Sequence, residues 1–534
     1  MKNIIRLSFL ILSTNSFGQS FGWVNTGIGN ENIEGKKVIS ADNEDIIVAG
    51  SLEGSGVFSN SNIIAIGDED FFLARYDSSG NNLWSRAYGG FEKDKIKGLA
   101  KGPNNTIYVC GSNEGSMIID TLIFNNLDGS NGFLAQLDQE GNIIWGLNLE
   151  SNDEISASAI AVSELDSIAY ISGHFKDSAF IGSYSISSFA SESFFVAAVD
   201  YFGNVIWVST GASQDEVEPL SMSLGADSSI IILGNFEGNF LVGSNVLPNS
   251  TDSDVFLLCL DQTGEFIWAK SIGGTNDIEG SSVKSDEQGN IFIVGSFEDE
   301  VHFNTDSLTS TDDKDGFFAR FDKDGNELWV KALSGTSDVQ PNDIFVDNYF
   351  QEIYITGSID GTCYFDTLAI INNTGTDLFI VKYDTSGTVM WGKGIGGSGS
   401  VEGYALSADN NSNPIITGYF DGTAFFDEIS ISGFSDHDFF IGKITPSEDT
   451  ASLSEIEYME NKVVLYPNPV NQSIYISFEY PNAPTNLTLE LTDAQGRHIR
   501  NLRWEQNKSI NVTSLDRGLY FLKNQKLVLR FYKQ

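Results

Sequence analysis

Hydrophobic and polar residues alternate along this chain in short runs of strand length. Turns rich in glycine and aspartate separate these runs. One such unit begins with "GSSVKSD" (280–286), which is rich in small residues, and "NIFIVGSF" (290–297), which is β-branched and aromatic. A polar segment of variable sequence follows, and then "DGFFARFD" (315–322), a turn and "NELWVKAL" (326–333). The pattern has no helical period and predicts four antiparallel strands.

The same unit recurs along the chain every 61 or 62 residues. Three markers keep one register: a tryptophan, a glycine of the second strand and a glycine in the last turn. They are Trp23, Trp84, Trp145, Trp207, Trp268, Trp329 and Trp391; Gly50, Gly111, Gly173, Gly234, Gly295, Gly357 and Gly418; and Gly80, Gly141, Gly203, Gly264, Gly325 and Gly387. A fixed period of this length is typical of a solenoid, a propeller or an array.

Seven copies of four strands predict an all-β fold, a seven-bladed β-propeller with the small-residue strand innermost and the Trp strand outermost. The seventh copy stops after "DFFIGKIT" (438–445), and an isolated Trp strand, "FGWVNTG" (21–27), precedes the first copy. We expect these two segments to pair and close the ring, because closure hides the terminal blade faces. In the turns "DKDG" (322–325) and "DSSG" (77–80), Asp is expected to cap the turn and Gly to take positive φ.

The ends of the chain differ from the repeats. Residues 1–18 read as a signal peptide, because Lys2 and Arg6 precede an apolar stretch too short to span a bilayer, and no later segment is a transmembrane candidate. Residues 19–445 form the predicted propeller, and the polar, acidic stretch 446–462 reads as a linker. Short strands in residues 463–534 predict a small β-sandwich of the Ig-like kind.

The chain carries a formal net charge of −43, unevenly spread. Residues 463–534 have a net charge of +4, so the part before them has −47. A body this acidic repels phosphate backbones, which argues against nucleic acid as a partner. Divalent cations and basic surfaces remain possible partners, and solubility in a salty medium is the simpler explanation.

Candidate chemistry is sparse, and we predict no catalytic and no metal residues. The cysteines Cys110, Cys259 and Cys363 are too few and too far apart for a disulfide framework or a zinc site. The four histidines, His174, His302, His437 and His498, have no zinc spacing, and a G-x-S-x-G elbow is absent from the sequence.

Two repeated features allow both a functional and a structural interpretation. Carboxylates recur just before the third strand, at Asp70, Asp254, Asp315, Asp377 and Asp438, with Asn131 and Ser193 in the other two copies. A ring of acids is able to bind calcium, but a cap at the start of a strand explains the repetition more simply. The tryptophans are able to stack on sugars, but one per copy is better explained as a wedge between blades.

Two parts of the sequence resemble known families. "W-x-K-x-I-G-G" (268–274) and "GNIFIVGSF" (289–297) resemble the β-propeller repeats of secreted bacterial proteins, over residues 21–445. "D-x-x-G" before Trp also looks like the turn of quinoprotein propellers, from which we infer no cofactor. "LYPNP" (465–469), "D-x-x-G-R" (493–497), "L-x-x-G-x-Y" (515–520) and a basic end resemble the type A C-terminal sorting domain of the type IX secretion system.

That second resemblance implies sorting-signal residues and a route of export. The residues are Tyr466, Pro467, Asn468, Pro469, Asp493, Gly496, Gly518, Tyr520 and Lys533. It implies recognition by the type IX secretion machinery, export across both membranes of a Gram-negative cell, and release or attachment at the outer surface. Family members commonly lose this domain on exit.

Taken together, the sequence predicts a secreted or cell-surface propeller that acts as a binding or structural module rather than an enzyme. Near-identical copy lengths leave no outsized loop to build a catalytic centre. The ligand is predicted to be a glycan or a protein, with no cofactor except possible calcium. The alternative is a polysaccharide hydrolase or lyase, which needs two carboxylates, one with a raised pKa, in the channel mouth.

Overall fold

The computed structural model describes most of the chain as two separate all-β units. It describes residues 19–446 except 60, 127–128, 189, 249–252 and 373–374, and then 463–466, 470–478, 486–493, 497–505, 509–515, 517–524 and 527–533. The two compact units are residues 1–448 and 449–534. The predicted signal peptide, residues 1–18, lies outside the described residues.

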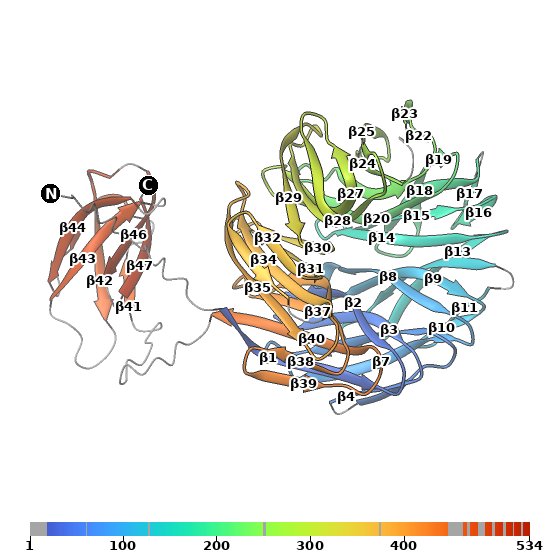
Figure 1. Ribbon diagram of the computed structural model, residues 1–534, viewed down its shortest axis with the longest axis horizontal. Helices are drawn as coiled ribbons and strands as arrows, with labels where there is room; N and C mark the ends of the chain where they lie inside the picture. The colour runs from blue at the N-terminus through green and yellow to red at the C-terminus, as the bar shows by residue number, and fades with distance from the viewer. Residues whose placement is uncertain are drawn as a thin grey trace, which may run out of the picture. The chain divides into compact units, whose positions relative to one another are not determined.

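Seven four-stranded antiparallel blades form a ring around a central channel (Figure 1). Each innermost strand contacts the innermost strands of the two neighbouring blades, and the last contacts the first, so the ring is closed. For blades 1 to 7 these strands are β2 (Ile33–Ser40), β8 (Asp94–Lys101), β14 (Ile155–Ser163), β20 (Val217–Leu224), β26 (Ile278–Ser285), β30 (Val339–Asp347) and β36 (Val401–Ala408).

The second and third strands of each blade are almost fully buried, and the hydrophobic core lies between neighbouring blades. The second strands are β3 (Ile46–Leu52), β9 (Ile107–Glu114), β15 (Ile168–Phe175), β21 (Ile230–Phe236), β27 (Ile291–His302), β31 (Glu352–Ile359) and β37 (Pro414–Phe420). The third strands are β6 (Asp70–Tyr76), β12 (Ser130–Leu137), β18 (Glu192–Asp200), β24 (Asp254–Leu260), β28 (Ser307–Phe321), β34 (Asp377–Asp384) and β40 (Asp438–Pro446). A single 3-10 turn, η1 (Pro103–Asn105), precedes β9 among the described residues.

The fourth strands carry the repeated tryptophans, and the fourth strand of blade 7 comes from the front of the propeller sequence. They are β7 (Asn82–Gly90), β13 (Ile143–Ser151), β19 (Val205–Ser213), β25 (Phe266–Gly274), β29 (Glu327–Gly335), β35 (Val389–Gly397) and β1 (Gln19–Gly29). β1 pairs antiparallel with β40, from Gln19 opposite Pro446 to Gly27 opposite Phe439. The predicted closure of the ring by residues 21–27 is confirmed.

The polar segment between the second and third strands is a hairpin, which the sequence pattern did not predict. Each hairpin leaves its own blade and pairs with the end of the Trp strand of the preceding blade. The Trp strand is therefore the fourth strand but not the sheet edge. The hairpins are β4 (Ser55–Phe58) with β5 (Ser61–Ile64), β10 (Met117–Ile119) with β11 (Leu122–Phe124), β16 (Ser178–Ile181) with β17 (Tyr184–Ser187), β22 (Phe240–Val242) with β23 (Asn245–Leu247), β32 (Thr362–Phe365) with β33 (Leu368–Ile371), and β38 (Thr423–Phe426) with β39 (Ile429–Ser432).

In blade 5 the same hairpin is continuous with the ends of β27 and β28. Gly273 and Gly274 of β25 pair with His302 and Val301, as the other Trp strands pair with their hairpins. Each copy therefore builds one blade and also binds the blade before it, which spreads the inter-blade contact over backbone hydrogen bonds as well as the core.

The tryptophans lie half-buried between blades, as predicted. Trp268 Nε1 donates a hydrogen bond to the backbone oxygen of Lys323, in the last turn of the next blade, at 3.1 Å. In the turns, Asp77 Oδ1 accepts the backbone N–H of Ser79 at 2.9 Å, and Gly80 has φ +86°, so the predicted turn chemistry is confirmed.

The C-terminal unit consists of two small antiparallel sheets that pack as a sandwich around one apolar cluster, which includes Val470, Ile476, Leu491 and Leu522. One sheet holds β41 (Val463–Tyr466), β42 (Ser473–Phe478) and β45 (Ile510–Asn511). The other holds β44 (His498–Glu505), β43 (Asn486–Asp493), β46 (Gly518–Asn524) and β47 (Leu527–Lys533).

Candidate functional site

Two of the repeated carboxylates before the third strands, Asp315 and Asp438, act as backbone caps. Asp315 accepts the N–H of Thr311 at 2.9 Å and that of Gly335, at the end of β29, at 3.0 Å. Asp438 does the same for Phe434 at 2.7 Å and for Gly29, at the end of β1, at 2.8 Å. In these two copies the carboxylate oxygens join the loop before the third strand to the neighbouring Trp strand, which is a structural role that needs no ligand. Among the described residues, no group of three or more His, Cys, Asp or Glu side chains is placed to hold a metal ion.

All seven innermost strands contain a β-bulge at the same position. Two residues of the innermost strand oppose one residue of the second strand, so the extra side chain is displaced from the regular alternation. The bulged residues differ in every blade apart from two pairs: Lys36, Lys97, Ser158, Leu220, Ser281, Asn342 and Tyr404. The backbone is therefore symmetric around the channel, whereas the side chains at the start of the innermost strands, which we name the channel mouth, are not.

An aromatic and charged group occupies the channel mouth where blade 7 meets blade 1. The ring centroids of Tyr404 and Tyr419 lie 5.6 Å apart, and those of Tyr419 and His437 lie 3.9 Å apart. The amine of Lys36 lies 4.2 Å from the ring centroid of Tyr404. Glu34 bonds both Lys36 and the Nδ1 atom of His437. We name these residues, with Glu402, the tyrosine group.

The electrostatics of the tyrosine group follow from burial and pairing. Burial opposes ionisation of Glu34, but Lys36 and His437 outweigh it and hold the pKa of Glu34 below its usual value. Burial, together with the nearby carboxylates Glu402 and Glu34, raises the pKa of both tyrosines. Tyr419 donates its hydroxyl to Glu402 at 2.8 Å. The raised pKa values keep the phenols neutral, so the group presents two phenols beside the ion pair of Lys36 and Glu34.

A second asymmetric group lies in blade 3. The Nε2 atom of His174 is 3.8 Å from Glu154 and 3.8 Å from Glu192. The proximity of His174 and the ion pair with Lys176 lower the pKa of Glu154 to about 2, against the effect of burial. Burial raises the pKa of Glu192, although His174 and the backbone N–H of Val217 oppose it. Two carboxyls with opposite shifts beside one imidazole are a recognised pattern of acid and base roles.

A third group, Asp70 and Asp94, is fully buried. Asp94 starts β8, at the position that Ile or Val occupies at Ile33, Ile155, Val217, Ile278, Val339 and Val401. Burial, then the charge of Asp70, raises the pKa of Asp94 to about 8. Both residues are 0% exposed. A substrate has no access to them, so this pair does not meet the requirement of an accessible acid and base.

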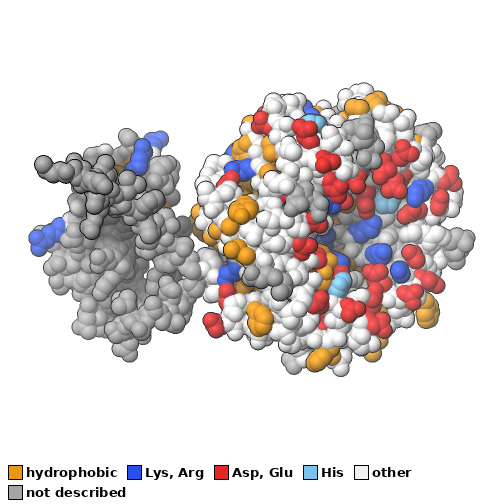
Figure 2. All heavy atoms as spheres, viewed as in Figure 1, with side chains coloured by type: hydrophobic (Ala, Val, Ile, Leu, Met, Phe, Trp, Pro, Cys, Tyr) orange, Lys and Arg blue, Asp and Glu red, His pale blue; other side chains and the backbone are white. Residues whose placement is uncertain are grey.

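Lysines are concentrated on the innermost strands of an otherwise acidic propeller. Of the 18 Lys and Arg residues between positions 19 and 446, six lie on these strands: Lys36, Lys37, Lys95, Lys97, Lys101 and Lys284. Figure 2 shows Lys and Arg side chains in the hollow of the ring and Asp and Glu side chains on the surface around it. The net charge of the whole body hides this separation into a basic channel and an acidic surface.

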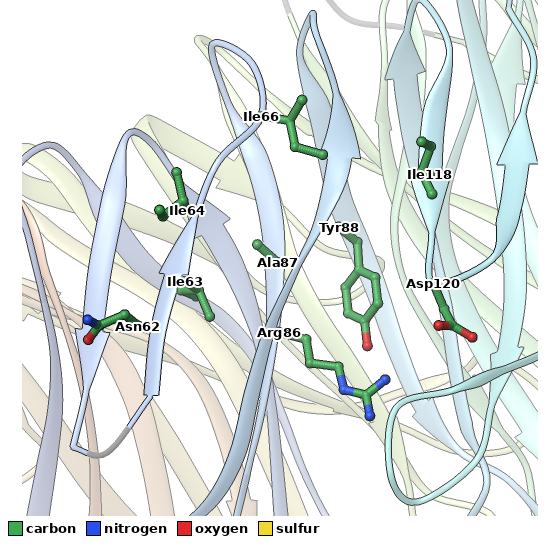
Figure 3. Close-up of a pocket in the computed structure, with 9 residues that line it drawn as sticks. All are labelled: Asn62, Ile63, Ile64, Ile66, Arg86, Ala87, Tyr88, Ile118 and Asp120. Carbon is green, nitrogen blue, oxygen red and sulfur yellow. The ribbon is translucent and has the colours of Figure 1, made fainter.

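A cavity of about 450 Å³ lies on the outer rim, between neighbouring hairpins (Figure 3). Ile64, Ile66 and Ile118 line it together with Arg86 and Tyr88 of β7. Tyr88 donates its hydroxyl to the backbone oxygen of Gly141 at 2.7 Å, and Arg86 donates to Asn142 at 3.0 Å. Both polar side chains already bind the next blade, so this cavity is a packing gap rather than a polar binding site.

The three cysteines are free and buried, and burial raises the pKa of the Cys110 thiol to about 12. They act as small apolar residues, as expected for the first two.

The structure brings together part of the predicted sorting signal. Asp493, at the end of β43, pairs with Tyr520, and Gly518, at the start of β46, pairs with Lys533. Tyr520 and Lys533 are each 8% exposed. Tyr466 ends β41, while Pro467, Asn468, Pro469 and Gly496 lie outside the described residues.

Comparison with known families bears on this C-terminal unit. Residues 464–529 match the family model described as "Secretion system C-terminal sorting domain". The unit is a type IX sorting domain. It indicates export to the cell surface or the medium. The described part of the chain contains no helix with the length and hydropathy of a membrane span.

The propeller is similar to proteins of diverse description. An uncharacterised WD repeat-containing protein of Acanthamoeba polyphaga mimivirus is 24% identical over 500 residues, covering 74% of this chain and 36% of that protein. Regulatory protein FlaEY of Caulobacter vibrioides is 29% identical over 120 residues, covering 21% of this chain and 12% of that protein. The chain thus spans about a third or less of these relatives.

Solved structures give weak overlaps with this chain. An inactive virginiamycin B lyase from Staphylococcus aureus covers 79% of this chain, with 99% of its own length aligned, at 9% identity and a TM-score of 0.38. A Lactobacillus plantarum protein covers 73%, with 98% of its own length, at 11% identity and a TM-score of 0.41. No activity is transferred from either structure.

Proposed function

We infer that this chain is an exported binding propeller whose ligand binds at the channel mouth. The observation that carries the proposal is the asymmetry of that mouth on a symmetric backbone. The fold requires the tryptophans, the turns and the caps in nearly every copy, but it does not require Tyr404, Tyr419 and His437 in only one. Side chains that converge on one cavity without a role in the repeat are the default candidates for ligand contacts.

The sorting domain supports a location outside the cell for this binding. Export by the type IX machinery, after a signal peptide directs the chain across the inner membrane, leaves the propeller in the medium or on the outer surface of a Gram-negative cell. A ligand met there is a glycan or a protein of the surroundings. Bridging calcium stays a prediction, which a chelator in the binding buffer tests: weaker binding with chelator supports it, and unchanged binding contradicts it.

The proposal is tested by a glycan array probed with the purified full chain and with Tyr404→Ala. We expect specific binding that Tyr404→Ala weakens about tenfold, since aromatic anchors contribute on the order of 1–3 kcal/mol each. Tyr349→Ala is the matched control, because Tyr349 is 74% exposed in the turn that follows β30, at the end of the innermost strand opposite to the channel mouth. Equal loss in both variants, or no loss in Tyr404→Ala, contradicts binding at the mouth.

One observation favours the alternative, a polysaccharide hydrolase or lyase. His174 stands between Glu154 and Glu192, whose pKa values are shifted in opposite directions. Incubation with marine and cell-wall polysaccharides distinguishes the two functions. Release of reducing ends or unsaturated sugars that His174→Ala abolishes establishes the enzyme, whereas binding without release supports the binding module.

A further inference from the structure

We propose that the lysine-lined channel binds a single anionic group, a carboxylate, sulfate or phosphate, at the end of a small ligand. This deepens the proposed function, on which it rests, by naming the chemistry that the mouth recognises. Lys37 and Lys284 are the central residues, and Lys36 and Lys97 flank them.

Lys37 lies on β2 at a level of the ring where the other blades supply mainly small side chains. It interacts electrostatically with Asp343 of blade 6 and Lys284 of blade 5, so its charge lies inside the channel rather than on the blade that carries it. The residues at the equivalent position are Gly98, Ala159, Ser221, Ser282, Asp343 and Ala405. These short side chains leave room beside the amine.

The one acidic residue at this level is already occupied. Asp343 accepts the hydroxyl of Ser282 at 2.7 Å and the backbone N–H of Leu406 at 2.8 Å. Within the described residues no carboxylate lies within 4 Å of the amine of Lys37 or Lys284, whereas Lys36 is paired with Glu34 and Lys97 lies 3.5 Å from Glu218. In the part of the chain that the structure describes, the amines of Lys37 and Lys284 therefore have no carboxylate within ion-pair distance.

The environment of Lys37 is unfavourable for an ammonium without a counter-ion. Burial lowers its pKa, and Lys284 and Lys36 lower it further, against the opposing effect of Asp343. A buried cation is normally paired, because desolvation costs more than a distant charge returns. An anion in the channel supplies the missing partner.

The charge of the surrounding surface limits which anions bind. The part of the chain before residue 463 has a net charge of −47, which repels a long polyanion before it reaches the channel. A ligand with one charged end, and the rest neutral, presents only that end to the lysines. The tyrosine group at the mouth is then free to contact the neutral remainder.

The test measures the melting temperature and the affinity of the full chain with sodium phosphate, sodium sulfate and galacturonate, against sodium chloride of equal ionic strength and neutral galactose. We expect at least one of the three anions to raise the melting temperature and galactose to have no effect, and the effective anion identifies the group. Polygalacturonate is expected to bind more weakly per residue than galacturonate. No response to any of the three anions overturns the proposal.

Lys37→Met and Lys284→Met are expected to weaken anion binding at least tenfold, because a charge-assisted hydrogen bond contributes roughly twice a neutral one. Lys323→Met is the matched control, since Lys323 is exposed and pairs with Asp324 on a turn. Without anion, Lys37→Met is expected to melt higher than the native chain, so lost binding is not lost folding. Equal weakening in Lys323→Met overturns the channel site. Array binding that depends on Tyr404 but not on Lys37 overturns this inference alone.

Discussion

The indole nitrogen of Trp84 donates a hydrogen bond to the backbone oxygen of Gln139, 55 residues further along the chain, at 3.0 Å. Trp145, Trp207 and Trp268 repeat this contact to the turn of the next blade. The tryptophan and the turn that it contacts are thus 55 residues apart, within a repeat of 61 or 62 residues. Trp145 keeps the contact at 2.9 Å although its partner is 56 residues away, so the contact tolerates one extra residue between the tryptophan and the turn.

Two described tryptophans lack this bond. Trp329 is one of them, and the equivalent turn oxygen, that of Thr385, accepts from Arg320 at 2.6 Å. Trp391 also lacks the bond, because its neighbour is blade 7, where β40 and β1 come from opposite ends of the propeller and no turn joins them.

Gly80→Ala is predicted to destabilise the propeller. Gly80 has φ +86°, and an added Cβ would lie 2.6 Å from Cδ2 of Trp23. We expect the free energy of unfolding to fall by about 1–2 kcal/mol because of the left-handed backbone, and by about 1–3 kcal/mol more because of overpacking against Trp23. Gly115→Ala is the control, with φ +66° and only the flexible Glu92 nearby, at 3.1 Å. Urea denaturation measures both variants, and equal losses contradict the role of the tryptophan contact.

Removal of residues 21–27 is predicted to lower the melting temperature sharply. It leaves β40 as a bare edge and removes the strand to which β4 also pairs. Removal of residues 19–20 alone, which pair only at the end of β40, is the control and is expected to have little effect. Calorimetry that finds the two deletions alike contradicts the closure argument.

Asp94→Asn is predicted to stabilise the propeller at high pH. The pKa of Asp94 is about 8 in the folded chain and about 4 in an unfolded one, so between these values the unfolded state binds fewer protons. Stability from this group therefore falls as pH rises from about 4 to about 8. Asp94→Asn removes this loss of stability. In urea melts at pH 5, 7 and 9, the stability of the variant relative to the native chain is therefore expected to increase with pH. The exposed turn variant Asp324→Asn is the control, and an advantage of Asp94→Asn that is constant with pH contradicts the prediction.

Removal of residues 463–534 is predicted to strand a folded propeller in the periplasm of a host with type IX secretion. The deletion removes the sorting domain, and residues 19–446 keep their own core and closure. Immunoblots of medium, surface and periplasmic fractions measure the outcome. Fusion of residues 463–534 to an unrelated periplasmic protein is the reciprocal control, and normal secretion of the truncated chain contradicts the assignment.

The blades were predictable from the sequence, because each marker has a local cause. Asp77 and Gly80 make a turn within four residues, and the tryptophans follow at a fixed interval. The hairpins were missed because their strands are short and partly polar. In "MIIDTLIF" (117–124), the buried residues Met117, Ile119 and Phe124 nevertheless alternate with exposed ones, and this was a usable signal.

The candidate site was not predictable from spacing. Glu34 and His437 are 403 positions apart and meet only because the ring closes. Lys37 and Asp343 belong to blades that are not neighbours in sequence, and the basic channel is hidden in the overall negative charge. The repeat is defined by the residues that the copies share, whereas the channel mouth is built from residues that differ between copies.

The position of strand β1 in the sequence determines when the ring is able to close. The seventh blade needs β1, from the front of the propeller sequence, and β40, which is synthesised about 420 residues later, so the ring stays incomplete until nearly all of the propeller exists. Until β40 has been synthesised, β1 has no strand of blade 7 to pair with. A chain exported before the ring closes can pass through a narrow channel as an extended polypeptide. A chain exported after closure must cross as a folded propeller.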